Sequence, residues 1–329
     1  MERMSRITAA LGDHTRRLIP ANTAHRALWA RRRKAMEASG HRYSPVGVRP
    51  AGSGAAFESA LPLFEVLLKA CGLYAIGHRT ARNIRVRRIE LAYANLPERF
   101  DGYTILHLTD LHIDKFEGLD DVIVSAVNGI NIDLCVMTGD FRAADDGPFE
   151  QIMAPMGRLM DAIKPQDGTY AVLGNHDDHQ LGLALERRLG VRLLANECDV
   201  IQRGDAQIRI VGADDVNRFY TADADRVLSG DCEEFTLALV HSPEMATEAA
   251  DGGCDLYLCG HTHGGQVCLP GGRPLVTHLS VNHHLASGLW QVGDMQGYTS
   301  PGAGVSGPPV RFFSHGEVTV FQLKRKHRG

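Results

Sequence analysis

Residues 84–329 are predicted to form a layered α/β domain. Short apolar runs of four to six residues recur along this part of the chain, and each ends in polar residues. Segments with a helical pattern of apolar positions lie between several of these runs. This alternation is typical of sheets covered by helices. The 44% hydrophobic content of the chain is sufficient to fill a large core.

The expected strands have the length of buried strands in layered domains. In chain order they are 103–108, 133–137, 170–173, 208–211, 235–240 and 256–259. The expected helices are 119–130, 148–163 and 180–189, where longer segments separate the apolar runs.

Residues 1–56 are predicted to be a basic and poorly ordered leader with, at most, short helices. This segment is rich in arginine, is interrupted by glycine, serine and proline, and shows little sustained periodicity. Such a composition offers few apolar residues for a packed core.

Residues 57–83 are predicted to contain an amphipathic helix and a basic linker. The stretch 57–76 is the most apolar in the chain, but it carries charges and is shorter than the roughly 20 apolar residues that a spanning helix needs. Five arginines follow it closely: Arg79, Arg82, Arg85, Arg87 and Arg88. Two interpretations stay open, a helix lying in a membrane interface and a helix packed on the domain surface.

The charge of the chain is strongly asymmetric. Residues 1–90 carry 17 Lys and Arg against 6 Asp and Glu, whereas the remainder carries 18 against 33. Because the acidic body would repel a nucleic-acid backbone, we expect no nucleic-acid partner. The basic residues of 1–83 suit an anionic membrane surface, with a solvated tail as the alternative.

The cysteines indicate a reducing compartment. There are seven, and no two form a Cys-x-x-Cys pair, which argues against a disulfide framework or a structural zinc site. Together with the basic segment, this predicts a cytoplasmic protein held peripherally on the cytoplasmic membrane.

Residues with metal-ligand side chains follow five of the six apolar runs. They are Asp110, His112, Asp140, Asn175, His176, His241, His261 and His263. The loops beyond the carboxyl ends of strands converge in open α/β sheets, so we expect these side chains to meet. A single histidine after a strand is more often an ordinary surface residue, but five such coincidences indicate a site.

The mixed ligand set favours divalent transition metals. Carboxylates, imidazoles and one amide oxygen suit manganese, iron or zinc better than calcium, and the ligands alone do not distinguish the three. Two metals that share a bridging carboxylate can stabilise the attacking and leaving oxygens of an in-line displacement.

The order of these residues resembles the calcineurin-like metallophosphoesterase family. The matching motifs are Asp110-Leu111-His112, Gly139-Asp140, Gly174-Asn175-His176-Asp177, His241, and Gly260-His261-Thr262-His263. The resemblance covers residues 84–323. It implies a four-layer α/β/β/α metallophosphoesterase sandwich, here with an N-terminal basic and amphipathic extension.

The resemblance also implies a role for each motif residue. One metal would be held by Asp110, His112 and His263, the other by Asn175, His241 and His261, and both by Asp140. His176 would face the substrate and protonate the leaving oxygen, with Asp177 orienting its ring. Many members of the family place Asp or Arg at the position of Ala143. Arg142 is the neighbouring residue here, and whether it takes over that role stays open.

The activity implied is hydrolysis of phosphodiester or pyrophosphate bonds by a hydroxide bound to two metals. Gly264-Gly265-Gln266 and residues 298–313 resemble the subgroup that includes membrane-associated phosphodiesterases and UDP-2,3-diacylglucosamine diphosphatases, and this resemblance implies a lipid-linked substrate. Two alternatives stay open, a phosphomonoesterase such as a protein phosphatase and a metal-free scaffold of the same fold.

Overall fold

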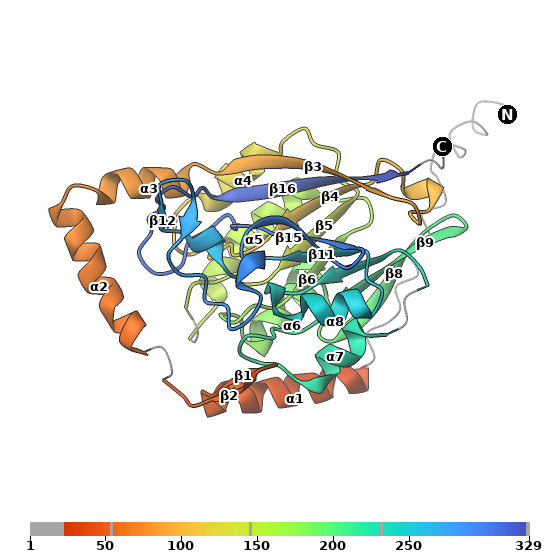
Figure 1. Ribbon diagram of the computed structural model, residues 1–329, viewed down its shortest axis with the longest axis horizontal. Helices are drawn as coiled ribbons and strands as arrows, with labels where there is room; N and C mark the ends of the chain where they lie inside the picture. Colours follow the sequence, from red (N-terminus) through yellow and green to blue (C-terminus); the bar gives the residue numbers. More distant parts are fainter. Residues whose placement is uncertain (1–22, 53–54, 145–146, 231–232, 327–329) are drawn as a thin grey trace.

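Two six-stranded β-sheets packed face to face form the centre of the protein (Figure 1). The computed structural model describes residues 23–52, 55–144, 147–230 and 233–326. Helices cover the outer face of each sheet, so the domain has four layers.

The first sheet is built mainly from the N-terminal half of the domain. Its strand order is β3 (Arg85–Tyr93), β16 (Glu317–Arg325), β4 (Thr104–Leu108), β5 (Leu134–Thr138), β6 (Thr169–Val172) and β7 (Arg192–Leu193). From β4 to β7 the strands are parallel, whereas β16 runs antiparallel to β4. The helices α4 (Leu119–Val127), α5 (Glu150–Ile163) and α6 (His179–Leu189) share a core with this sheet.

The second sheet repeats this arrangement. Its order is β14 (Gly288–Val292), β15 (Met295–Thr299), β11 (Leu256–Cys259), β10 (Thr236–Leu239), β9 (Ala206–Gly212) and β8 (Glu197–Arg203). The four central strands are parallel, and β14 and β8 are antiparallel edge strands. The helices α7 (Ala222–Leu228) and α8 (Ala246–Asp251) pack on its outer face.

Alternate residues of each central strand explain the layers. On β4, Leu106 and Leu108 pack against the helices, whereas Ile105 faces the second sheet. On β10, Leu237 and Leu239 fill the space between the sheets. Because both faces of these strands are buried, their sequences are continuously apolar, as expected of parallel sheets covered on both sides. The predicted four-layer sandwich is confirmed, and all six predicted strands are present.

The N-terminal region corrects one expectation. Instead of a poorly ordered leader, Thr23–Ser39 form helix α1, followed by the short strands β1 (Arg42–Ser44) and β2 (Gly47–Arg49). Arg26 of α1 is buried and donates to Glu197 (2.9 Å) and to the carbonyl of Leu193 (2.7 Å). The arginines that indicate disorder in the sequence thus find acidic and carbonyl partners on the domain. Residues 1–22 lie outside the described part of the chain.

The predicted helix over 57–76 is interrupted. Helix α2 (Ala55–Ala70) and helix α3 (Tyr74–Arg82) meet at an angle of 107°. No single described helix meets the length and apolarity needed to cross a bilayer, although α2 and α3 meet them as a bent pair. Helix α3 packs on the domain through Gly77 and Ala81, whereas α2 projects from its edge (Figure 1).

A small part of the fold adjoins the last motif. The turn η3 (His263–Gly265) leads into the two-stranded pair β12 (Cys268–Leu269) and β13 (Arg273–Pro274). The single turns η1 (Glu98–Phe100), η2 (Pro243–Met245) and η4 (His283–Leu285) complete the described elements.

Candidate metal centre

The loops that follow five central strands meet beyond the carboxyl ends of strands from both sheets. Asp110 and His112 follow β4, Asp140 follows β5, and Asn175 follows β6. The remaining ligand candidates follow strands of the second sheet: His241 after β10, and His261 and His263 after β11. The described chain therefore brings together the side chains that the sequence predicts to meet.

The side chains form two groups whose ligand atoms lie within 4.8 Å of one another. One group contains Asp110, His112, Asp140 and His263, and the other contains Asp140, His241 and His261. In the first group, the Nε2 atoms of His112 and His263 are 3.2 Å apart. In the second, His261 Nδ1 lies 3.2 Å from His241 Nε2.

Asp140 belongs to both groups. Its Oδ2 atom lies 3.7 Å from His112 Nε2 and 3.2 Å from His241 Nε2. Its Oδ1 atom accepts a hydrogen bond of 2.9 Å from the backbone amide of His176. One carboxylate oxygen thus faces both groups while the other is fixed by the backbone, which is the arrangement that a bridging ligand requires.

Backbone carbonyls orient two of the imidazoles. His112 Nδ1 donates to the carbonyl of Arg142 (2.8 Å), and His241 Nδ1 donates to that of Thr138 (2.6 Å). With Nδ1 occupied by this hydrogen bond, Nε2 is the ring atom that faces the carboxylates and that could bind a metal. This type of outer contact fixes the tautomer of metal-binding histidines.

Burial keeps several of these histidines neutral. It lowers the pKa of His112 to about 4 and the pKa values of His261 and His263 well below the ordinary value. At neutral pH their lone pairs are therefore available to a cation. His241 differs. Burial alone would lower its pKa, but the hydrogen bond to Asp140 and the combined negative charges of Asp140, Asp110 and Asp215 raise it.

The surroundings also shift the pKa values of the two carboxylates. Burial raises the pKa of Asp110 to about 6. Burial alone would also raise the pKa of Asp140, but the neighbouring histidines, His241 foremost, together lower it well below its ordinary value. In the absence of metal, a proton on His241 balances the Asp140 carboxylate. A divalent ion would replace that proton, so we expect metal binding to release protons.

Five of the seven ligand candidates have left-handed backbone conformations. Their φ angles are 49° at Asp110, 37° at His112, 56° at Asp140, 72° at His261 and 51° at His263. Non-glycine residues rarely adopt such angles, and the cost is of order 1–3 kcal/mol each. Strain of this kind collects at functional sites, where it aims side chains that an ordinary turn would not bring together.

Two glycines make the close approach of the loops possible. A Cβ atom on Gly174 would lie 2.2 Å from Asp140 Oδ1, and one on Gly260 would lie 2.1 Å from Asp110 Oδ2. Any other residue at either position would displace a ligand candidate.

Asn175 supplies an independent test of whether a metal fits. Its side-chain oxygen Oδ1 is buried and has no hydrogen-bond partner among the described residues. A buried amide oxygen without a partner is costly, and coordination to a cation would remove that cost. The donor set and this oxygen therefore both fit divalent metals.

His176 lies beside the first group. Its ring is 5.0 Å from the ring of His112, centroid to centroid, and the two are edge to face. The structure shows contacts of Asp177, the residue expected to orient the His176 ring, with the backbone. Its carboxylate accepts hydrogen bonds from the backbone amides of Asp140 (2.7 Å), Phe141 (2.9 Å) and Gly174 (2.8 Å). Asp177 thus ties the loop after β6 to the loop after β5.

Arg142 also holds these loops together. It is buried, and it donates to the carbonyls of His176 (3.0 Å) and Gly147 (2.7 Å) and to the Asp178 carboxylate (2.9 Å). The sequence suggests Arg142 only as a neighbour of Ala143, the position where many family members have Asp or Arg. Its contacts instead fix the backbone on either side of Asp177.

Arg311 was not singled out from the sequence. Its fully buried guanidinium donates to the carbonyls of His263 (2.9 Å), Pro301 (2.6 Å) and Gly304 (2.8 Å). It therefore fixes the last motif against the loop that follows β15. No motif marks this arginine, because its partners are carbonyl groups that are invisible in a side-chain pattern.

Comparison with known proteins agrees with this geometry. Residues 103–265 match the model of the family described as calcineurin-like phosphoesterase. The chain is 31% identical over 240 residues to the uncharacterized metallophosphoesterase YkuE of Bacillus subtilis, covering 70% of this chain and 82% of that protein. It is 28% identical to phosphodiesterase YaeI of Escherichia coli, covering 67% of this chain and 82% of that protein.

A vertebrate relative is longer. The zebrafish (Danio rerio) transmembrane protein with metallophosphoesterase domain is 29% identical over 260 residues, which cover 73% of this chain and 57% of that protein. Together with the two ligand groups, these matches establish that the chain belongs to the calcineurin-like phosphoesterase family and is a metal-dependent phosphoester hydrolase.

Proposed function

We propose that the protein hydrolyses phosphodiester or pyrophosphate bonds of a lipid-linked substrate with the help of two divalent metal ions. The observation that carries the proposal is the position of Asp140, whose Oδ2 atom faces both groups of ligand candidates. One ion would be held by Asp110, His112 and His263, the other by Asn175, His241 and His261, and both by Asp140.

The metals would supply charge neutralisation at the phosphoryl oxygens and a water of lowered pKa. The residues of this chain would supply geometry and a proton. His176 lies at the edge of the first group, where its imidazolium can donate a proton to the departing oxygen. The backbone contacts of Asp177 and Arg142 would hold His176 at that position.

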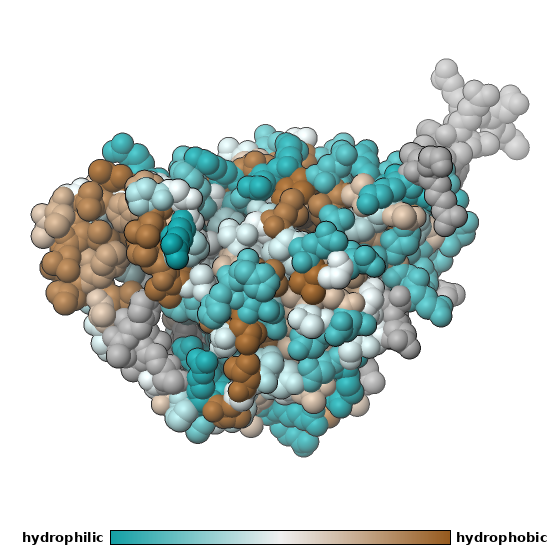
Figure 2. Space-filling model, viewed as in Figure 1, coloured by the Kyte–Doolittle hydropathy of each residue, from teal (hydrophilic) through white to brown (hydrophobic). Residues whose placement is uncertain are grey.

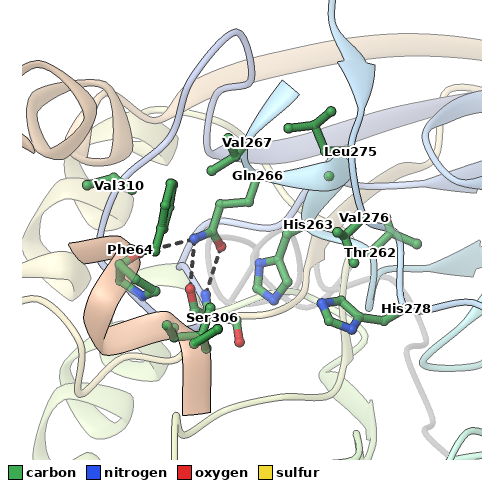
Figure 3. Close-up of a pocket in the computed structure, with 15 residues that line it drawn as sticks. Phe64, Thr262, His263, Gln266, Val267, Leu275, Val276, His278, Ser306 and Val310 are labelled. Atoms are coloured by element: carbon green, nitrogen blue, oxygen red, sulfur yellow. Dashed lines mark hydrogen bonds between the residues drawn. The ribbon is translucent and has the colours of Figure 1, made fainter. Parts of the chain in front are cut away.

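A cavity beside the metal centre supports the proposal that the substrate carries an apolar group. Its volume is about 270 Å³, and His263 forms part of its wall (Figure 3). Its walls are mostly apolar and come from α2 and from the loops near the last motif, including Leu61, Phe64, Val267 and Val310. A substrate with its phosphate at the metals could place a hydrocarbon chain here, since burying each CH₂ contributes about 0.8 kcal/mol.

The surface next to this cavity supports attachment to a membrane. Large apolar side chains of α2 and α3 are exposed, including Leu63 (63%), Val66 (60%) and Ile76 (56%), and Figure 2 shows hydrophobic residues gathered over this edge of the protein. The basic residues Arg79, Arg82, Arg85, Arg87 and Arg88 follow directly and are also exposed. Apolar and basic side chains together suit the interface of an anionic bilayer, here the cytoplasmic face of the membrane.

We expect hydrolysis to depend on metal and to favour diesters. Purified protein should cleave bis-p-nitrophenyl phosphate in the presence of manganese or zinc, and chelation should abolish turnover reversibly because the ligands remain in place. The rate is measured as p-nitrophenol release, with p-nitrophenyl phosphate as the comparison substrate. Faster cleavage of the monoester would favour the phosphomonoesterase alternative, and folded protein without metal or activity would favour the scaffold.

Substitution of His176 should separate chemistry from metal binding. His176→Ala should keep both metals and lose on the order of 10²-fold in kcat, because a positioned acid contributes about that much. Metal content is measured by elemental analysis and kcat with a diester that has a poor leaving group. An unchanged kcat would refute the proposed role of His176.

We expect the protein to bind anionic vesicles through α2. Sedimentation with vesicles of phosphatidylglycerol and phosphatidylcholine should show binding that weakens at high salt, because each basic residue near the surface contributes about 1 kcal/mol. The double variant Leu63→Glu/Leu67→Glu should lose this binding. The control is Leu289→Glu, which changes a similarly exposed leucine (49%) on β14. Equal binding of wild type and double variant would overturn the membrane proposal.

A further inference from the structure

Helix α1 lies outside the region that matches the family, yet it reaches the loop that carries Asn175 and His176. The match begins at residue 103, whereas α1 spans Thr23–Ser39 and contacts α6. Three of its residues, Trp29, Arg33 and Glu37, are spaced four apart and therefore lie on one face of the helix.

Arg33 is the centre of this face. Its side chain is completely shielded from solvent. The Nη2 atom donates to the carbonyl of Gly174 (3.1 Å) and to that of Asp177 (2.8 Å), whereas Nη1 donates to the Asp214 carboxylate. The guanidinium also stacks on the ring of Phe219, with its central carbon 3.4 Å from the ring centroid.

The two carbonyls that Arg33 binds belong to the first and last residues of the loop 174–177. Gly174 precedes Asn175, and Asp177 follows His176. A single planar guanidinium thus spans the turn in which the predicted metal ligand and the predicted proton donor lie. Since Arg142 binds the carbonyl of His176 (3.0 Å), the loop is held by two buried arginines.

Glu37 continues the contact by one helical turn. Its two carboxylate oxygens accept hydrogen bonds from the backbone amide (2.8 Å) and Nδ1 (2.6 Å) of His179. It also lies 3.3 Å from Arg33 Nε. On the other side, Trp29 Nε1 donates to Asp214 (2.7 Å), which fixes the partner of Arg33.

Burying an arginine costs free energy unless its charge is paired and its guanidinium is hydrogen-bonded, so the partners of Arg33 limit the positions that the loop can adopt. The forked guanidinium donates to two carbonyls and a carboxylate at once in a fixed plane. A lysine at this position would keep the charge near Asp214 but could not reproduce that planar geometry.

We propose that Arg33 is a positioning residue, through which α1 holds the loop 174–177 in the geometry needed for catalysis. This inference rests on the role of His176 proposed above. Misplacement of a catalytic group by about 1 Å can cost on the order of 10²-fold in rate. The N-terminal segment is therefore required for full activity on any substrate, including a water-soluble diester.

The test compares Arg33→Ala and Arg33→Lys with Arg32→Ala in the full chain. Arg32 is the matched control, because it is on the same helix but its half-exposed side chain forms an ion pair with Asp223. We expect kcat on a diester with a poor leaving group to fall about tenfold or more in Arg33→Ala, with a smaller loss for a good leaving group and little change in KM. Arg33→Lys should be folded and intermediate, and Arg32→Ala should resemble wild type.

Two further measurements distinguish positioning from general destabilisation. In the His176→Ala background, Arg33→Ala should cost at most about twofold more, because the two substitutions affect the same step. Hydrogen exchange should accelerate at the amides of residues 174–178 but not at those of residues 260–264.

Additive losses in the double variant, or unchanged exchange at 174–178, would overturn the inference. If the wild-type protein hydrolyses no phosphoester, the proposed function fails. The exchange measurement still tests the contact between Arg33 and the loop in that case.

Discussion

The position of the Asp140 carboxylate is the constraint on which the rest of the site depends. The loop that carries Asp140 also binds its neighbours through the backbone. The amides of Asp110 and His112 donate to the carbonyls of Gly139 (2.9 Å) and Asp140 (3.0 Å), respectively. Asp177 accepts the amide of Asp140 in turn. Hydrogen bonds thus hold the loops after β4 and β6 to the loop after β5. A shift of Asp140 would therefore move both groups of ligand candidates.

This arrangement places several charged groups in an interior that otherwise disfavours them. Asp110 and Asp140 are almost completely buried, as are His112 and His241. Burying carboxylates is costly unless opposite charges or hydrogen bonds compensate. Divalent ions are the strongest compensation that these ligands allow, so the same groups that destabilise the metal-free protein become its metal site. We therefore expect metals to stabilise the fold as well as to enable the chemistry.

The sequence best predicts those strands and site residues that are marked by residue type. Strands buried on both faces leave an apolar run, so β4, β5, β6, β9, β10 and β11 could be predicted. The residues after them carry ligand side chains, and the parallel topology explains why they converge. Edge strands such as β3 and β8 are not predicted, because exposed polar residues interrupt their apolar positions and no continuous apolar run marks them.

Contacts between distant segments could not be predicted in this way. From the sequence, Arg33 is predicted to belong to a basic, poorly ordered leader. Its partners Gly174, Asp177 and Asp214 lie more than 140 positions away in the chain, so no local pattern indicates them. The only available signal was the spacing of Trp29, Arg33 and Glu37 on one helical face. The contacts of Asp177 were equally hidden, since backbone amides give no pattern in a sequence.

The most direct test of the shared Asp140 carboxylate is anomalous diffraction from crystals of the manganese-loaded protein. The account predicts two peaks about 3.5–4 Å apart, both within bonding distance of Asp140, as two-metal hydrolases require. One peak alone, or a second peak that does not contact Asp140, would contradict it.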